Sequence, residues 1–187
     1  QLETVKIGVD NLKGAYEATK HLIQSGRDKI LNVTGSKFGL SGERFKGYKQ
    51  ALLDHNIPFV SNYYLQCNMQ SNELLDADLR VALKNIMSTE LKPNAILSSS
   101  DTISVRILGI LSELGYSVPE ELALIGFSNV DFPDSLNPSL STIRQPTKEI
   151  GRLATERLIQ FIKRGNWIQY GPETIELDTE LTFRKST

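Results

Sequence analysis

The stretch NAILSSSDTISVRILGILSELGYSVPEELALIGF (94–127) contains the pattern that decides the fold. Its two ends, 94–100 and 121–127, are short, continuously apolar runs of strand length, and the segment between them places apolar residues at helical spacing. Continuously apolar strands joined by a helix are typical of a parallel sheet that is covered on both faces. The stretch therefore predicts one strand–helix–strand unit of an α/β domain.

The same alternation continues on the N-terminal side of this stretch. Apolar and β-branched runs at 5–10, 29–35 and 59–65 predict three more strands, and the segments between them have helical spacing. The helical stripes are Ala15, Ala18 and Leu22; Phe45, Tyr48 and Leu52; and Leu75, Leu79, Ala82 and Ile86. The sequence therefore predicts the α/β class, with a doubly wound parallel sheet.

Capping residues mark the expected ends of these helices. Ser41 is predicted to begin one helix, and either Ser100 or Asp101 is predicted to begin another, because their side chains can accept hydrogen bonds from the first turn. Gly26 and Gly115 are predicted to end helices, since glycine readily adopts the left-handed conformation found there.

The last third of the chain departs from the alternation. Residues 128–141 include two prolines and predict a long loop, which is a common place for functional residues. Pro146 is predicted to open a helix that ends at Gly165. Two short strands, at 173–177 and 180–184, close the chain.

Composition and charge narrow the function. The 187 residues carry 21 Lys and Arg against 22 Asp and Glu, which predicts one compact domain that does not grip nucleic acid by itself. Cys67 is the single cysteine and the two histidines lie far apart in sequence, so we predict no disulfide, no zinc site and no cofactor. No apolar run has the length of a membrane span, and we expect no membrane partner. The start at Gln1 favours a processed, trimmed or truncated product.

Polar residues follow several of the predicted strands. In doubly wound sheets, ligands bind at the carboxyl ends of the strands. Short polar residues stand there at 10–11, 34–36, 98–101 and 128–131, and they suit a polyhydroxylated or anionic small molecule. Helix capping explains any single one equally well, so their shared position is the stronger indication. The motifs GxSxG, GxxxxGK[ST], GxGxxG and HExxH are absent, and we predict no enzyme activity.

Five stretches resemble the effector-binding domain of LacI/GalR-type transcription regulators, the lactose and galactose repressor family. They are DNLKGAYEATKHLIQSGRDKI (10–30), GERFKGYKQAL (42–52), NAILSSSD (94–101), LGYSVPEELALIGFSN (114–129) and NPSLSTIRQPTKEIGRLATERLIQFI (137–162). The match covers nearly the whole chain and follows the family's order. It implies a periplasmic binding protein-like fold of type I, mainly the C-terminal subdomain.

The resemblance also implies how the chain is organised. Residues 1–9 would be a strand leading out of an N-terminal subdomain that is mostly missing, and 10–143 would form the C-terminal effector-binding and dimerisation subdomain. Residues 144–165 would be a helix of the N-terminal subdomain, and 166–187 would be final strands that return to the C-terminal one. We expect the apolar face of that helix to pack against another copy of the chain or to be mobile.

The family's site residues carry over in part. The effector contacts that the resemblance implies are Arg44, Ser100, Asp101, Ser128 and Asn129, and the implied dimer-interface residues are Val105 and Leu108. A surface arginine paired near Glu43 is the alternative role for Arg44. The family often has Asn where this chain has Ser100 and Asp where it has Ser128, and no ring-stacking aromatic stands at 67–69. These departures favour an effector other than a plain hexose.

The resemblance implies a ligand-sensing and dimerisation fragment of a bacterial, cytoplasmic, sugar-responsive transcription regulator. Its partners would be a small-molecule effector, a second copy in a homodimer, and operator DNA bound through a headpiece that is not present in this chain. The alternative is a periplasmic sugar-binding protein of an ABC transporter, which would differ in having an export signal. An enzyme on the same sheet has only analogy of fold to support it.

Overall fold

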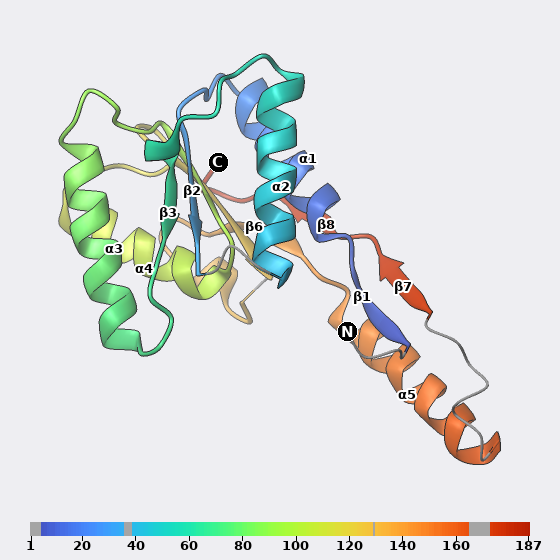
Figure 1. Ribbon diagram of the computed structural model, residues 1–187. Coiled ribbons are helices and arrows are strands. Elements are labelled where there is room, and N and C mark those ends of the chain that lie inside the picture. The colour runs from blue at the N-terminus through green and yellow to red at the C-terminus, as the bar shows by residue number, and fades with distance from the viewer. Residues whose placement is uncertain (1–4, 36–38, 129, 165–172) are drawn as a thin grey trace. The chain divides into compact units, whose positions relative to one another are not determined.

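The computed structural model describes residues 5–35, 39–128, 130–164 and 173–187 (Figure 1). The chain divides into two compact units, a larger unit of residues 11–144 and 180–187 and a smaller unit of residues 1–10 and 145–179. The expectation of one compact domain from length and composition is therefore wrong. Composition cannot detect that the chain leaves one unit and later returns to it.

The larger unit is built on one six-stranded sheet. Its strands are β2 (Ile30–Thr34), β3 (Tyr64–Gln66), β4 (Ala95–Ser98), β5 (Ala123–Ser128), β6 (Ser141–Arg144) and β8 (Glu180–Thr182). They follow the order β3-β2-β4-β5-β6-β8, and every neighbouring pair is parallel except β6 and β8. The predicted α/β class with a doubly wound parallel sheet is confirmed, with one antiparallel strand added at its edge.

Helices cover both faces of this sheet (Figure 1). Helices α1 (Asn11–Gln24) and α2 (Gly39–Asp54) lie on one face, and α3 (Asn72–Met87) and α4 (Asp101–Glu113) lie on the other. Two short 3-10 turns, η1 (Ser61–Tyr63) and η2 (Pro133–Ser135), lie in the connections. Successive strand residues point to opposite faces: Ile30 packs with α1 and α2, and Leu31 packs with α3 and α4. The unit therefore has two apolar cores separated by the sheet.

Local signals placed most helix ends correctly. Gly26 and Gly115 have φ values of 85° and 81°, as expected of glycines that follow a helix. Of the two predicted caps of α4, Ser100 takes the position, and its hydroxyl accepts a hydrogen bond from the Ile103 amide. In α3 the buried stripe runs through Leu83 and Met87 instead of Ala82 and Ile86. Both pairs of residues are apolar, so the sequence does not distinguish them, and the orientation of the helix on the sheet decides which pair is buried.

Two strands differ from the prediction. Residues 61–63 form the 3-10 turn η1, so β3 begins only at Tyr64 and not at 59. The strand β6 begins at Ser141, where the predicted loop ends, and was not predicted, because its sequence STIR is short and has a single apolar residue. It is a strand because β5 and β8 hydrogen-bond to its two sides.

The smaller unit contains two parallel strands and a helix. Strand β1 (Lys6–Val9) pairs with β7 (Thr174–Leu177), with Ile7 opposite Ile175, and α5 (Thr147–Arg164) is its helix. The prediction gave both closing strands to the larger subdomain; β8 lies there, but β7 pairs with β1 instead. Along α5, three apolar side chains are strongly exposed, namely Leu158, Ile159 and Ile162.

Candidate functional site

Polar residues gather where the parallel strands of the larger unit end. Thr34 at the end of β2, Ser98 at the end of β4 and Asp101 at the start of α4 are buried, and Ser128 at the end of β5 is half-buried. Parallel strands place these ends at the same edge of the sheet. Arg44 reaches the same edge from α2. The edge therefore combines hydroxyls, one carboxylate and one guanidinium.

Arg44 is held inside the protein and not paired on the surface. Its side chain is 8% exposed, its Nε donates a hydrogen bond of 2.8 Å to the Asn11 side-chain oxygen, and its Nη1 donates to the Ser99 carbonyl. The guanidinium carbon lies 3.6 Å from the centre of the Phe127 ring, a cation–π contact. Contacts from three segments thus fix the plane of the guanidinium.

Burial lowers the pKa of Arg44, but the guanidinium keeps its proton. Removal from water lowers the pKa of Arg44 to about 10, and the nearby Asp101 carboxylate opposes that shift. The group therefore stays cationic at neutral pH. A buried, orientated cation is suited to bind ligand oxygens, because guanidinium donors lie in a fixed fork.

Asp101 is engaged by the protein itself. The Thr142 hydroxyl lies 2.9 Å from each of its carboxylate oxygens, and the Val130 amide donates a hydrogen bond of 2.9 Å to Oδ2. A methyl group on Gly126 would lie 2.0 Å from Oδ1, so the backbone of β5 also approaches it closely. The carboxylate ties the start of α4 to β6 and to the chain that follows β5.

The remaining predicted effector contacts lie around this carboxylate. Ser100 is the half-buried cap of α4 described above, so the capping alternative does describe its hydroxyl. Ser128 has a φ of 117°, a conformation that is costly for a residue with a side chain and that tends to cluster at ligand sites. Asn129 lies outside the described residues.

A largely polar hollow of about 480 Å³ lies at the ends of β2 and β3. It is lined by Gly35, Gln66 to Gln70 and Asp78. The Met69 side chain covers Gly35, and a methyl group on Gly35 would lie 2.5 Å from Met69 Cγ. This hollow adjoins the strand ends that carry the other polar residues.

The thiol at this hollow is expected to be unreactive in the folded protein. Cys67 is 3% exposed, and burial, followed by the nearby Asp78 carboxylate, raises the pKa of its thiol to about 12. Because the thiolate is the reacting form, its reaction with Ellman's reagent at pH 8 should be slower by about two orders of magnitude than in concentrated urea. Equal rates in the two solutions would contradict the described burial.

The two predicted dimer residues differ in exposure. Leu108 is 8% exposed and packs in the core between the sheet, α3 and α4, whereas Val105 on the same helix is half-buried. Leu108 is thus largely used within the single chain, because α3 covers the helix face that carries it. Val105 retains surface that a second copy could cover.

Several partners of the site were not singled out from the sequence. Asn11 was noted only as a strand-end or capping residue, Phe127 only as the last residue of a predicted strand, and Thr142 belongs to the strand that was not predicted. Each acts through a tertiary contact, so no local signal distinguishes it. Among the described residues, no group of three His, Cys, Asp or Glu side chains could hold a metal ion, and no helix is long and apolar enough to cross a membrane.

Comparison with known proteins decides the family. The family model of the periplasmic binding protein-like domain matches residues 19–187. The chain belongs to the periplasmic binding protein-like domain family. The fold expected from the resemblance is thereby confirmed.

The relatives of this periplasmic binding protein-like domain are named as regulators. It is 33% identical over 179 residues to the HTH-type transcriptional repressor PurR of Actinobacillus pleuropneumoniae, covering 95% of this chain and 51% of the relative. It is 31% identical over 167 residues to the ribose operon repressor of Haemophilus influenzae, covering 89% and 49%. The chain thus spans about half the length of these curated relatives.

A solved structure agrees with the sequence relatives. The sugar-binding transcriptional regulator of the LacI family from Escherichia coli superposes with a TM-score of 0.79 at 27% identity, covering 96% of this chain and 62% of that one. The resemblance to LacI-type effector-binding domains is therefore confirmed at the level of the periplasmic binding protein-like domain.

Proposed function

We propose that the larger unit binds a small effector, a sugar or sugar derivative, at the carboxyl edge of its sheet. The observation that carries the proposal is Arg44, a buried cation whose plane is fixed by Asn11, Ser99 and Phe127 at that edge. Its described hydrogen bonds use Nε and Nη1, and Nη2 is the donor we assign to the effector. A guanidinium donating to a hydroxyl or an anionic oxygen fits this ligand class.

The neighbouring residues take different roles in this proposal. Ser100, Ser128 and Asn129 supply hydroxyl and amide contacts to the effector. Asp101 positions the chain after β5 through the Val130 amide and the Thr142 hydroxyl, because both of its oxygens are engaged there. A serine at position 128 gives one hydroxyl where a carboxylate would accept two hydrogen bonds, which favours a derivative over a plain hexose.

We further propose that the chain is the ligand-sensing part of a bacterial, cytoplasmic transcription regulator without enzyme activity. The names of the relatives favour this role over that of an exported sugar-binding protein of an ABC transporter. Operator DNA would be bound by a headpiece that is not among these 187 residues, in a homodimer to which Val105 and Leu108 contribute. The effector would act by differential affinity for two conformations of the dimer.

The smaller unit is part of a second subdomain in this proposal. The strand β1 and the helix of residues 144–165 would belong to an N-terminal subdomain completed by residues outside this chain, with the paired strand β7 joining them. The strongly exposed Leu158, Ile159 and Ile162 support this assignment, because apolar helix faces are normally buried against a partner.

The test is effector binding by the complete product of the gene. Pentoses, hexoses and their phosphate esters are titrated by calorimetry, and the best ligand is then titrated into an Arg44→Lys variant. Lysine keeps the charge but loses the fork, so we expect a loss of about 2 kcal/mol, roughly thirtyfold in Kd. Release or retention of operator DNA by the same ligand reports on the regulator role.

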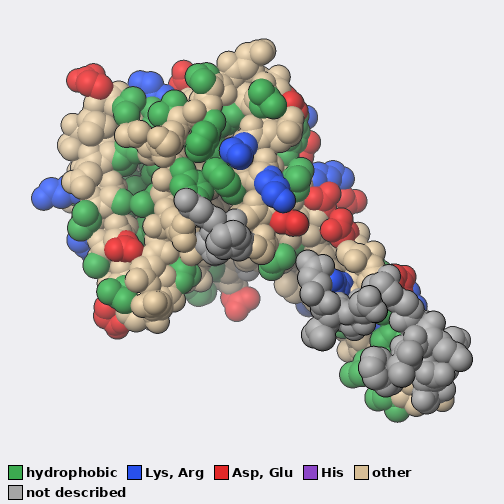
Figure 2. All heavy atoms as spheres, in the orientation of Figure 1, with side chains coloured by type: hydrophobic (Ala, Val, Ile, Leu, Met, Phe, Trp, Pro, Cys, Tyr) green, Lys and Arg blue, Asp and Glu red, His purple; other side chains and the backbone are tan. Residues whose placement is uncertain are grey.

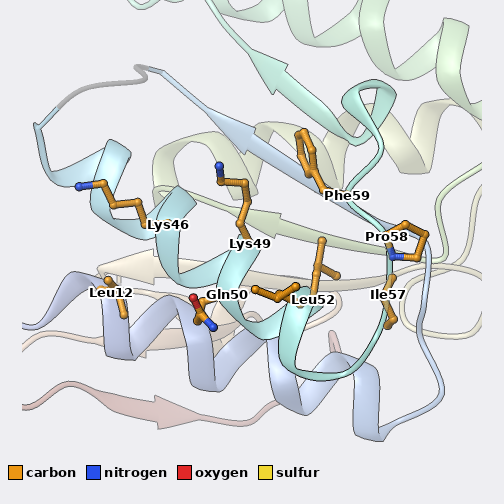
Figure 3. Close-up of a pocket in the computed structure, with 9 residues that line it drawn as sticks. Leu12, Lys46, Lys49, Gln50, Leu52, Ile57, Pro58 and Phe59 are labelled. Carbon is orange, nitrogen blue, oxygen red and sulfur yellow. The ribbon is translucent and has the colours of Figure 1, made fainter.

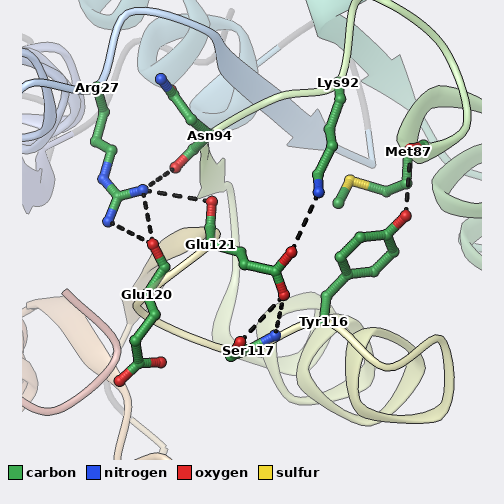
Figure 4. A network of polar contacts seen from close by, with 8 residues as sticks. All are labelled: Arg27, Met87, Lys92, Asn94, Tyr116, Ser117, Glu120 and Glu121. Carbon is green, nitrogen blue, oxygen red and sulfur yellow. Dashed lines mark hydrogen bonds and ion pairs between the residues drawn. The ribbon is translucent and has the colours of Figure 1, made fainter.

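Arg27 provides a matched control at the opposite edge of the same sheet. Its guanidinium donates to the carbonyls of Asn94 and Pro119, next to the ion pair of Lys92 and Glu121 (Figure 4). Arg27→Lys removes a comparable set of internal hydrogen bonds and should lower Tm while leaving effector Kd unchanged. If Arg44→Lys also leaves Kd unchanged, Arg44 is not an effector contact.

A further inference from the structure

The outward side of α2 carries a hollow that is separate from the effector edge. The hollow measures about 590 Å³ and lies over α2, the first turn of α1 and the segment that follows α2 (Figure 3). The residues that matter here are Leu12, Lys46, Lys49, Leu53, Ile57 and Phe59, and they are called the α2 patch below. All of them belong to the larger unit.

Most residues of the α2 patch are apolar, and several of their side chains are exposed to solvent. Leu12 is 41% exposed, Leu53 is 68% exposed and Phe59 is 43% exposed. Single exposed apolar residues are ordinary, whereas a group gathered around a hollow marks an interaction surface. Figure 2 shows hydrophobic and basic side chains next to one another over α2.

The charges of the α2 patch have one sign. Lys46 and Lys49 stand one turn apart on α2, and the ion pairs found among the described residues involve other cations. The Lys49 ammonium lies 5.2 Å from the centre of the Phe45 ring and 6.0 Å from that of Phe59. Positive charge thus borders the apolar surface without an acidic partner in the described chain.

The charge and the exposure of the α2 patch argue against three kinds of binding partner. A second copy related by a two-fold axis would bring two positively charged patches together without any acidic residue of the patch to pair with, which is unfavourable. A membrane surface is normally bound by clusters of 4–8 cations, and the α2 patch has two. A small molecule would remain largely in water, because the apolar lining is so exposed.

We propose that the α2 patch is a docking surface for an acidic amphipathic helix of a partner protein. The apolar face of such a helix would cover Leu53 and Phe59, and carboxylates one turn apart would pair with Lys46 and Lys49. This interaction goes beyond effector sensing and does not depend on it, since Arg44 lies on the buried side of the same helix.

The test uses the complete product of the gene, as in the effector titration, and a fluorescent helical peptide as the probe. The peptide carries Leu at positions i, i+3, i+4 and i+7 with Glu one turn apart beside them, and a second peptide has Lys in place of each Glu. We expect the acidic peptide to bind the chain at least about tenfold more tightly, measured by fluorescence anisotropy at low salt. In a Lys46→Glu/Lys49→Glu variant the preference should reverse.

Two more variants separate the apolar contribution from a general effect. Leu53→Ser should weaken binding of the acidic peptide about tenfold, because Leu53 is the most exposed apolar member of the patch. Lys84→Glu and Leu74→Ser, both exposed residues of α3, are the matched controls and should leave binding unchanged, with circular dichroism confirming that every variant is folded.

Four outcomes would overturn the proposal. Equal binding of both peptides, or unchanged binding by the double variant, would exclude charge recognition at this surface. Binding to phosphatidylserine vesicles that the double variant alone loses would assign the α2 patch to a membrane. A dimer in sedimentation velocity that the same variant alone converts to a monomer would assign it to a second copy of the chain.

Discussion

Replacing Gly47 by valine is expected to lower the free energy of unfolding by about 3 kcal/mol or more, because α1 and α2 touch at this residue. A Cβ atom at Gly47 would lie 2.1 Å from the Leu12 carbonyl oxygen and 3.0 Å from the Tyr16 amide nitrogen. Both are backbone atoms of α1, so the helix itself would have to move. Urea denaturation followed by circular dichroism measures the loss.

Gly109 gives the control for this prediction. It is also a helical glycine, in α4, but nothing lies within 4 Å of the Cβ it lacks. Gly109→Val should therefore change the free energy of unfolding by no more than about 0.5 kcal/mol. Equal effects of the two substitutions would mean that the close contact between α1 and α2 does not limit what fits at Gly47.

Removing the hydroxyl of Ser186 is the second substitution with a large expected effect. This fully buried hydroxyl donates to the Leu124 carbonyl at 2.7 Å and accepts from the Ser141 amide at 2.8 Å, joining β5 and β6 to the tail after β8. Ser186→Ala would leave two buried backbone groups without partners, at about 1–3 kcal/mol each. We expect the urea midpoint to fall with an unchanged m-value.

An exposed serine shows what the loss of a hydroxyl costs elsewhere. Ser112 lies on the exposed side of α4, and Ser112→Ala should be nearly neutral. If Ser186→Ala were as mild as Ser112→Ala, water would have to reach Leu124 and Ser141, and the tail would not be part of the core.

The parts of the fold that could be predicted are those with a local cause. Strands β2, β4 and β5 are mostly apolar and buried along nearly their whole length because helices cover both of their sides, and the stripe of α1 is buried as its spacing indicates. Gly26 and Gly115 end helices for a reason that lies in one residue. In these places sequence and structure are related over a few neighbouring positions.

The parts that could not be predicted depend on distant contacts. Strand β6 is defined by its neighbours β5 and β8, and the pairing of β7 with β1 joins opposite ends of the chain. The candidate site has the same character. Arg44 was singled out by family resemblance, because a buried arginine on a helix has the same local sequence as an exposed one. Its partners Asn11 and Phe127 became apparent only in three dimensions.

The pairing of β6 with β8 has a consequence for the order of folding. The two strands are hydrogen-bonded neighbours, yet the whole segment 145–179 separates them in the chain and belongs to the smaller unit. The entropy cost of closing such a loop grows slowly with its length, but contacts of long sequence separation form late in folding. We therefore expect a refolding chain to assemble its five parallel strands first. The amide of Leu124, which donates to the Ser186 carbonyl of the tail, and that of Arg184, which donates to the Ser141 hydroxyl, would then become protected from hydrogen exchange in the slowest phase.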